Sequence, residues 1–214
     1  MLTLVSFTLH AEDVIRIACV GDSITYGAGI EERAKNSYPA QLQNLLGDRY
    51  QVENFGVSGR TLLKQGDKPY WDEPAYQNAL AFKPDMVIIK LGTNDVKPLN
   101  WKHRAAFAGD LKALVQSFQS LSSQPTVFLA NPVPVQESRW KIKEDTIVNG
   151  VMPLVKQVAD ELQLAIVDFH AAVPAEAQYF KDGIHPNAAG AQRMAACAAA
   201  AVRGVGTEVK LGLD

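Results

Sequence analysis

A serine on a glycine-containing turn is the first residue of the chain that could act as a nucleophile. Ser23 lies in the segment 20–25 (VGDSIT), directly after the short apolar run 15–20 (IRIACV). A run of this length, rich in β-branched residues and ended by glycine, is typical of a buried strand. Ser23 therefore falls at the carboxyl end of a predicted strand, where open α/β sheets bind their ligands. A lone serine in such a turn is more often a capping hydroxyl, so the chemistry depends on what other segments supply.

Three further segments carry groups that could complete an acyl-transfer site. Gly59 and Asn94 each follow a predicted strand, and His185 precedes the last predicted helix. Because the carboxyl ends of parallel strands meet at one edge of a sheet, we expect these residues to converge with Ser23. Acyl transfer needs a nucleophile, a base, a group that orients the base, and donors for the oxyanion. Each residue alone is more often structural, but their occurrence together predicts a serine hydrolase.

The elements that must position these groups alternate between strands and helices. Apolar patterning predicts strands at residues 15–20, 50–55, 85–91, 126–130 and 164–168. It predicts helices at residues 37–46, 107–121, 147–162 and 187–202. Pro153 should kink the third helix or begin a new helical segment there. This alternation implies right-handed crossovers and predicts an α/β fold, with a five-stranded parallel sheet and helices on both sides.

One long segment does not fit the alternation. Residues 60–76 are polar and aromatic without a clear period, and they include Gly66, Pro69 and Pro74. Loops of this length inside a compact domain are usually functional. We therefore expect this segment to form an irregular loop that determines substrate specificity.

Composition excludes several classes of protein. The chain of 214 residues suits one domain, predicted over residues 14–214. A formal charge of -2 without a basic cluster argues against nucleic acid as a partner. Cys19 and Cys197 are expected to be buried free thiols, and the four histidines are scattered rather than spaced as metal ligands. We expect no metal and no cofactor, and the oligomeric state is left open.

The amino-terminal residues suggest export. The apolar stretch 2–9 (LTLVSFTL) is similar to the hydrophobic part of a secretory signal, with Ala11 as a cleavage position, although no basic residues precede it. We predict that residues 1–13 are a signal-peptide remnant or a disordered terminus, and that the protein is periplasmic or extracellular. The alternative is a cytoplasmic protein with an extra edge segment. Neither this stretch nor any other apolar run is long enough to span a bilayer.

The four polar segments resemble the four blocks of the SGNH (GDS-motif) hydrolases. They are residues 21–25 (GDSIT), 54–59 (NFGVSG), 92–95 (GTND) and 182–186 (DGIHP), which occur in the family's order and cover most of the chain. Gly-Asp-Ser alone is weak evidence, whereas all four blocks at these spacings are specific. Ile24 departs mildly from the leucine that usually follows the serine. The resemblance implies a flavodoxin-like three-layer αβα sandwich.

The resemblance also implies a role for each matching residue. Ser23 Oγ would be the nucleophile, and His185 the general base that later protonates the leaving alcohol. Asp182 would hold the imidazole in the correct tautomer. The oxyanion hole would consist of the backbone N–H groups of Ser23 and Gly59 and the side-chain amide of Asn94. A glycine lets the backbone approach a substrate closely, and an amide donates without carrying charge.

Four other polar residues at the same edge are interpreted as structural. Asp22 and Asp95 lie beside the proposed catalytic groups. Asp22 is expected to bond the backbone of its turn, and Asp95 is expected to be structural. Asp168 and His170 follow the fifth strand and could form a second dyad, but we interpret them as a solvated strand end.

The substrate is less well determined than the reaction. The family resembles carbohydrate O-acetylesterases, lysophospholipases, thioesterases and arylesterases alike. The wider segments 54–71, 90–95 and 100–101 look like the branch of sialate or xylan acetylesterases. A lipid chain would need a long apolar groove, yet the loops at this edge are polar and proline-rich. We therefore predict a serine esterase that removes short acyl groups, foremost acetyl, from a carbohydrate.

Aromatic residues near the same edge could form a platform for a sugar. Tyr70, Trp71, Trp101 and Trp140 lie in or near these loops. The substrate-binding candidates are Arg60, Tyr70, Trp71 and Trp101, although any single aromatic more often packs its loop onto the body. Two alternatives remain open, a lysophospholipase or thioesterase of the same fold and a non-catalytic carbohydrate-binding protein.

Overall fold

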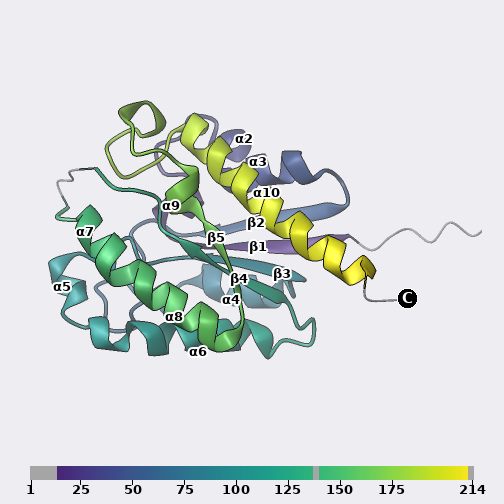
Figure 1. The fold of residues 1–214 in the computed structure, drawn as a ribbon, viewed down its shortest axis with the longest axis horizontal. Coiled ribbons are helices and arrows are strands. Elements are labelled where there is room, and N and C mark those ends of the chain that lie inside the picture. Colours follow the sequence, from purple (N-terminus) through teal and green to yellow (C-terminus); the bar gives the residue numbers. More distant parts are fainter. Residues whose placement is uncertain (1–13, 137–139, 212–214) are drawn as a thin grey trace, which may run out of the picture.

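A parallel sheet of five strands forms the centre of the molecule (Figure 1). The computed structural model describes residues 14–136 and 140–211, with side chains as far as residue 205. The strands are β1 (Ile15–Gly21), β2 (Tyr50–Gly56), β3 (Met86–Lys90), β4 (Thr126–Asn131) and β5 (Ala165–Asp168). Their order is β2-β1-β3-β4-β5, and all neighbouring pairs are parallel. The five predicted strands and their parallel arrangement are confirmed.

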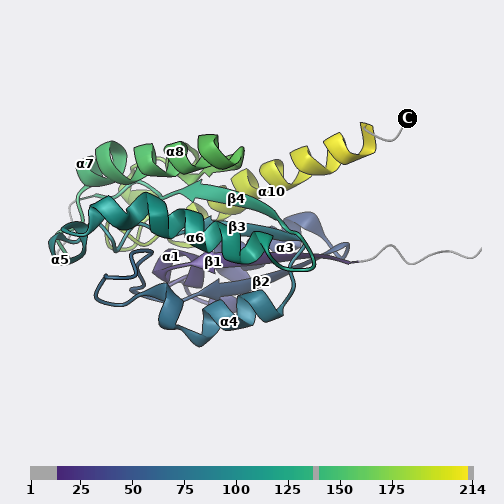
Figure 2. The same ribbon diagram turned by 90° about the horizontal axis from the view of Figure 1, so that it is seen from below.

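Helices cover both faces of this sheet. The α-helices are α1 (Ser23–Tyr26), α2 (Arg33–Asn36), α3 (Tyr38–Leu46), α4 (Pro74–Ala81), α5 (Pro98–Trp101), α6 (Phe107–Gln119), α7 (Glu144–Thr146), α8 (Met152–Leu162), α9 (Phe169–Ala172) and α10 (Ala188–Leu211). Short 3₁₀ segments are η1 (Tyr70–Asp72), η2 (Arg104–Ala106) and η4 (Ala177–Tyr179), and η3 (Ile147–Val151) is a π-helix. Helices α3 and α10 pack together on one face, and α4, α6 and α8 cover the other (Figures 1 and 2). This is the predicted three-layer αβα sandwich.

The burial of each strand follows its position in the sheet. All five residues of β3, in the middle, are buried, as its apolar sequence predicts for a strand covered on both faces. The edge strand β2 alternates between more and less exposed residues along most of its length. The apolar stripe of α6 packs into the core through Phe107, Leu111, Leu114, Val115 and Phe118.

Two helices differ in detail from their predicted bounds. The segment predicted as one helix over residues 147–162 begins as the π-helix η3, and α8 then starts with Pro153 in its first turn. Helix α10 was expected to end near Val202 but continues to Leu211. A helix makes its hydrogen bonds within its own backbone, so it can continue past the sheet it packs on, as the yellow end of α10 does in Figure 1.

Two glycines allow the segment after β1 to lie directly on the sheet. Gly21 and Gly56 are paired across β1 and β2. A Cβ atom on Gly56 would lie 2.2 Å from the backbone nitrogen of Tyr26, and one on Gly21 would lie 2.2 Å from Thr25 Oγ1. The segment forms the helical turn α1 rather than the simple turn that we expected. A side chain at either glycine would push this helix, and Ser23 with it, away from the sheet.

The segment 60–76 is irregular as predicted, apart from η1 and the start of α4, but it packs closely onto the body of the protein. A role of this segment in substrate specificity stays a prediction. Leu62, Leu63 and Tyr70 are fully buried. The carboxylate of Asp95 accepts hydrogen bonds from the backbone N–H groups of Leu62 at 3.1 Å and Leu63 at 2.8 Å. The segment then forms η1 and enters α4. Its leucines and tyrosine bury apolar surface, and this packs the segment onto the body of the protein.

Within the described residues, no helix combines the length and apolar character needed to cross a membrane. The predicted export signal at residues 1–13 lies outside the described residues and stays a prediction.

Alanine should have opposite effects on stability at a glycine packed against α1 and at a glycine with open space around it. Gly56→Ala should lower the free energy of unfolding by about 1–3 kcal/mol, because the new methyl group meets backbone atoms that cannot move freely. Gly109→Ala in α6 is the control: it has no heavy atom within 4 Å of the added Cβ, and should raise stability by about 0.5–1 kcal/mol. Urea unfolding of both variants tests this, and equal stability of Gly56→Ala and the wild type would contradict it.

Candidate active site

The serine predicted as a nucleophile begins α1 at the carboxyl end of β1. The side chain of Asp22 caps this helix by accepting a hydrogen bond from the backbone N–H of Ile24 at 2.9 Å. The N–H groups of a helix's first turn have no partner within the helix, so Ser23 combines a hydroxyl with a backbone donor. Asp22 thus stabilises a backbone turn, as the sequence predicts.

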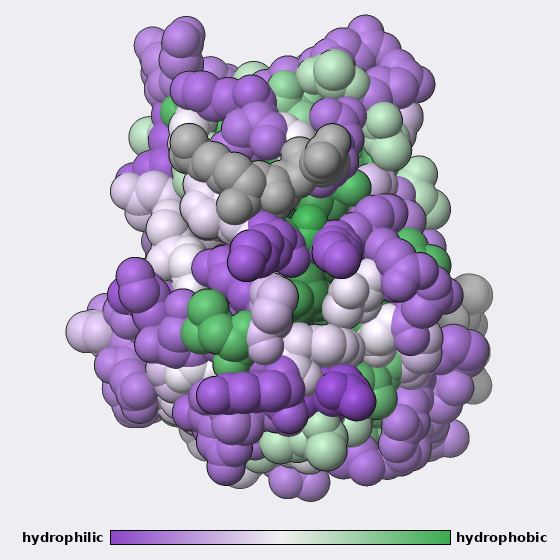
Figure 3. All heavy atoms as spheres, turned by 90° about the vertical axis from the view of Figure 1, so that its left-hand side faces the viewer, coloured by the Kyte–Doolittle hydropathy of each residue, from purple (hydrophilic) through white to green (hydrophobic). Residues whose placement is uncertain are grey.

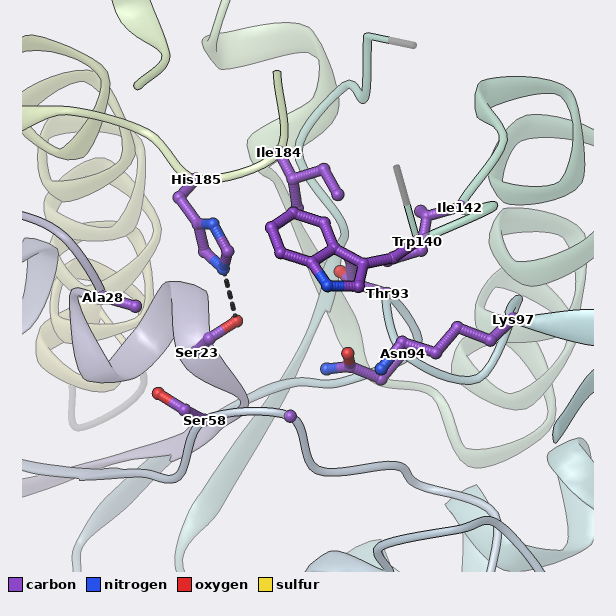
Figure 4. A pocket seen from close by; sticks show the side chains of 11 residues that line it. Ser23, Ala28, Ser58, Thr93, Asn94, Lys97, Trp140, Ile142, Ile184 and His185 are labelled. Carbon is purple, nitrogen blue, oxygen red and sulfur yellow. Dashed lines mark hydrogen bonds between the residues drawn. The ribbon is translucent and has the colours of Figure 1, made fainter. Parts of the chain in front are cut away.

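Ser23, His185 and Asp182 form one hydrogen-bonded chain. Ser23 Oγ lies 2.9 Å from His185 Nε2, although 162 residues separate the two in sequence (Figure 4). On the other side of the ring, His185 Nδ1 lies 2.8 Å from Asp182 Oδ2. The carboxylate also accepts hydrogen bonds from the backbone N–H groups of His185 at 2.9 Å and Ile184 at 3.1 Å. The three residues therefore have the geometry of a nucleophile, a base and an orienting carboxylate.

The surroundings of Asp182 favour its ionised form. Partial burial acts to raise the pKa of this carboxyl. The hydrogen bonds from the backbone and ring of His185, the charge of that ring and the N–H of Ile184 outweigh burial, so the pKa of Asp182 lies below its ordinary value. A carboxylate that stays ionised can hold the imidazole ring in one orientation and stabilise its positive charge.

Asn94 and Gly59 line the same cavity as Ser23. Asn94 is almost fully buried, and its Nδ2 donates to the carbonyl of Arg60 at 3.1 Å. One of the two amide protons is thereby used, and the other remains for a substrate oxygen. Gly59 has φ = +81°, a backbone conformation that favours glycine, while nothing lies closer than 4.0 Å to an added Cβ. Backbone conformation, rather than crowding, therefore accounts for glycine at this position.

The cavity opens at the edge of the sheet where the strands end. It has a volume of about 240 Å³. The lining residues from the predicted blocks are Ser23, Ser58, Gly59, Thr93, Asn94, Ile184 and His185, and the remaining ones are Ala28, Lys97, Trp140 and Ile142. Figure 3 faces this end of the molecule, where hydrophilic side chains surround a central strip of hydrophobic ones.

Comparison with known proteins identifies the family. A sequence profile of the GDSL-like lipase/acylhydrolase family matches residues 19–193. The chain belongs to this family. An acetylxylan esterase of Xylanibacter ruminicola is 44% identical over 210 residues, and a multidomain esterase of Ruminococcus flavefaciens is 26% identical over 217 residues. These alignments cover 90% and 86% of this chain but 44% and 28% of the two relatives, so the chain spans less than half the length of either.

Solved structures of other esterases have the same fold as this chain. A carbohydrate acetylesterase from Sinorhizobium meliloti superposes with a TM-score of 0.75 at 21% sequence identity. An aryl esterase from M. smegmatis superposes with a TM-score of 0.74, also at 21% identity. Each comparison covers 89% of this chain and 99% of the other. The predicted SGNH hydrolase fold is confirmed.

None of the four predicted substrate-binding residues of this GDSL-like protein lines the cavity. Tyr70 is fully buried and donates its hydroxyl to the carbonyl of Phe55 at 2.7 Å, so it cannot stack on a sugar. Trp71 donates Nε1 to the carbonyl of Leu62 at 2.8 Å. These aromatic residues pack the segment 60–76 onto the body, which is the alternative that the sequence left open for each.

The other two candidates also make contacts within the protein. The guanidinium of Arg60 donates hydrogen bonds to the carboxylate of Glu73 at 2.5 Å and to the backbone carbonyl of Ser58 at 3.0 Å. The Trp101 ring packs edge-on against Phe107 and lies 2.6 Å from the position of a Cβ on Gly150. A role for these residues in substrate binding stays a prediction without support from the lining of the cavity.

Two residues outside the four predicted blocks, Trp140 and Lys97, border the cavity. The Trp140 ring lies edge-on to the His185 ring, with 5.9 Å between the ring centroids. Lys97 borders the cavity beside Asn94 (Figure 4). The sequence indicated Trp140 only as one of several aromatics near this edge, and it carried no indication of Lys97.

A buried ion pair that the sequence did not indicate lies beside Ser23. Lys90 and Asp22 are both fully buried, with 3.0 Å between Nζ and Oδ2. Burial lowers the pKa of Lys90, whereas the negative charges of Asp22 and Asp95 act to raise it. Burial also raises the pKa of Asp95 to about 7, and the charge of Asp22 adds to this effect. A lysine inside an otherwise apolar strand was the feature of the sequence that could have revealed the pair.

Asp168 and His170 do not form a second dyad. Asp168 Oδ1 accepts from Asn131 Nδ2 at 3.1 Å and from the backbone of Ala171 at 3.2 Å, whereas His170 Nε2 lies 2.6 Å from Glu144 Oε1. Throughout the described part of the chain, no three or more His, Cys, Asp or Glu residues are grouped so that they could hold a metal ion.

The lowered pKa of Asp182 predicts how its contribution to stability depends on pH. Because the folded pKa lies below the unfolded value of about 3.9, the contribution is fully present above that pH and is lost as the pH falls through the folded value. The wild type should therefore exceed Asp182→Asn in unfolding free energy at pH 7, and this difference should shrink below about pH 4. Urea unfolding across this range measures it. A difference that stays constant throughout would contradict the prediction.

Proposed function

We propose that this chain is a serine esterase that removes short acyl groups, foremost acetyl, from a carbohydrate. The observation that carries the proposal is the hydrogen-bonded chain of Ser23, His185 and Asp182, which meets Asn94 and Gly59 at a single cavity. A nucleophile, base, orienting carboxylate and two kinds of oxyanion donor are thus present together.

The geometry suits a two-step reaction. Ser23 Oγ attacks the ester carbonyl carbon as its proton passes to His185 Nε2, 2.9 Å away. The oxyanion formed is stabilised by the N–H groups of Ser23 and Gly59 and by the Asn94 amide. The carbon–oxygen bond to the sugar then breaks, and His185 gives its proton to the departing sugar oxygen, which leaves as a hydroxyl group. Water, deprotonated by His185, cleaves the acyl-enzyme and restores Ser23.

The size of the cavity supports a short acyl group. Pockets for drug-sized ligands have volumes of about 300–1,000 Å³, whereas this cavity has about 240 Å³. A long alkyl chain would therefore have to lie largely outside it, which disfavours a lysophospholipase or thioesterase. The acetylxylan esterase and the carbohydrate acetylesterase among the compared proteins act on esters of the proposed class, as their names state.

A chain-length series tests the reaction and the acyl group together. Activity of the wild type on 4-nitrophenyl esters should be highest for acetate and fall towards decanoate. Ser23→Ala should lose at least about 10³-fold in kcat, because it lacks the nucleophile. An organophosphonate should label the wild type at Ser23 and leave Ser23→Ala unmodified. Activity that rises with chain length would indicate a lipid ester, and absence of both labelling and turnover would leave a binding protein.

Trp140 is predicted to contact the sugar, since its ring borders the cavity beside His185. Trp140→Ala should lower kcat/KM on acetylated xylo-oligosaccharides about tenfold more than on 4-nitrophenyl acetate, a loss of about 1.4 kcal/mol of transition-state binding. The matched control is Trp71→Ala, which removes a tryptophan outside the cavity and should affect both substrates equally. Equal losses on the two substrates for Trp140→Ala would contradict a role in sugar binding.

A further inference from the structure

Lys90 is a charged residue at the end of the central strand β3, with none of its side chain exposed. Its ammonium group has three N–H donors, and three acceptor atoms surround it. Nζ lies 3.1 Å from Asp22 Oδ1, 3.0 Å from Asp22 Oδ2 and 2.6 Å from Thr93 Oγ1. The group is thus fully hydrogen-bonded in the interior of the protein.

Burial of this pair is not explained by stability alone. Removing two charges from water costs several kcal/mol for each ion, and well-packed apolar residues in place of a buried pair are often as stable or more stable. The other residues of β3 are Met86, Val87, Ile88 and Ile89, which meet the demands of a buried strand without any charge. A lysine at the carboxyl end of this strand therefore points to a role beyond packing.

The two partners of Lys90 belong to two of the three segments that carry the proposed oxyanion donors, and the third is the Gly59 segment. Asp22 precedes Ser23, and its Oδ1 accepts from the N–H of Ile24 at 2.9 Å while also bonding Lys90. Thr93 precedes Asn94 and lines the cavity. The two segments extend from the neighbouring strands β1 and β3. The pairing of these strands ends at Gly21 and Lys90, so the two segments leave the sheet side by side. A single ammonium group thus connects the nucleophile segment to the Asn94 segment.

We propose that Lys90 is a positioning residue of the active site, which holds the backbone N–H of Ser23 and the side-chain amide of Asn94 at the spacing that an oxyanion requires. It acts through Asp22 and Thr93 and does not touch the substrate. This inference rests on the proposed esterase function. It concerns a transition-state interaction, so loss of Lys90 should affect kcat and leave KM nearly unchanged.

The main test replaces both members of the pair, so that neither is left as the unpaired charge of the other. In Lys90→Met/Asp22→Asn both charges are absent, and the asparagine oxygen can still cap Ile24. We expect a kcat on 4-nitrophenyl acetate at least about tenfold lower, with KM changed by less than about threefold. Labelling by an organophosphonate should slow in parallel, because its oxygen occupies the same donors.

The matched control removes a charge from the other end of the neighbouring strand. Arg16 lies near the start of β1 and pairs with Asp85 at 3.3 Å. Arg16→Met should lower the unfolding midpoint while kcat stays within about twofold of the wild type, since this pair lies away from the cavity. If Lys90 had only a structural role, the double variant would behave like this control: its unfolding midpoint would fall and its kcat would stay within about twofold of the wild type.

A milder pair of variants keeps the test decisive if the double variant does not fold. Thr93→Val removes one acceptor of Lys90 with little change in volume, and Thr93→Ser retains the hydroxyl. We expect kcat to fall about three- to tenfold in Thr93→Val and to recover to within about twofold in Thr93→Ser, with KM steady in both.

The outcomes separate this inference from the proposed function. If the wild type hydrolyses esters, but folded Lys90→Met/Asp22→Asn and Thr93→Val both keep wild-type kcat, the positioning role is overturned. A parallel rise in KM would also overturn it, because that result indicates a contact with the substrate. If the wild type itself neither hydrolyses esters nor reacts with the organophosphonate, the esterase function fails, and with it this inference.

Discussion

The carboxylate of Asp22 is shared between the first turn of α1 and the ammonium of Lys90. It accepts from the N–H of Ile24 at 2.9 Å and lies 3.0 Å from Lys90 Nζ, with both charged side chains fully buried. This arrangement joins the helical turn that begins with Ser23 to the neighbouring central strand. Because the pair is shielded from water, its interaction is stronger than a surface salt bridge, and removal of either partner would leave an unpaired buried charge.

Close packing supports the same segment from the other side. Gly21 and Gly56 leave room for α1 directly on β1 and β2, where any side chain would meet the helix. The serine is therefore held by an ion pair and by backbone contact with the sheet. His185 arrives from the loop before α10, and its hydrogen bond to Asp182 fixes the ring towards Ser23. For the proposed esterase reaction, a serine held in this way and an oriented imidazole would leave little reorganisation before the transition state.

The packing of residues 60–76 explains why the predicted aromatic residues do not line the cavity. Tyr70 and Trp71 lie in a segment whose leucines bury themselves against the body, and Asp95 binds the backbone of that segment. Their rings therefore pack inward, and Trp140 lies beside His185 instead. Loop residues of similar composition thus take different roles according to which backbone groups find partners in the protein.

The sequence by itself determined the order of the five strands and of helices α3, α6, α8 and α10, the parallel sheet and the convergence of Ser23, Gly59, Asn94 and His185, whereas it did not indicate α4. These features follow from local periodicity and from the rule that parallel strands end at one edge of a sheet, and neither needs long-range detail. Only the tertiary structure decided the burial of Lys90 against Asp22 and the inward packing of residues 60–76. It also decided which tryptophan borders the cavity. These outcomes depend on contacts between residues far apart in sequence, which local periodicity and motif spacing do not indicate.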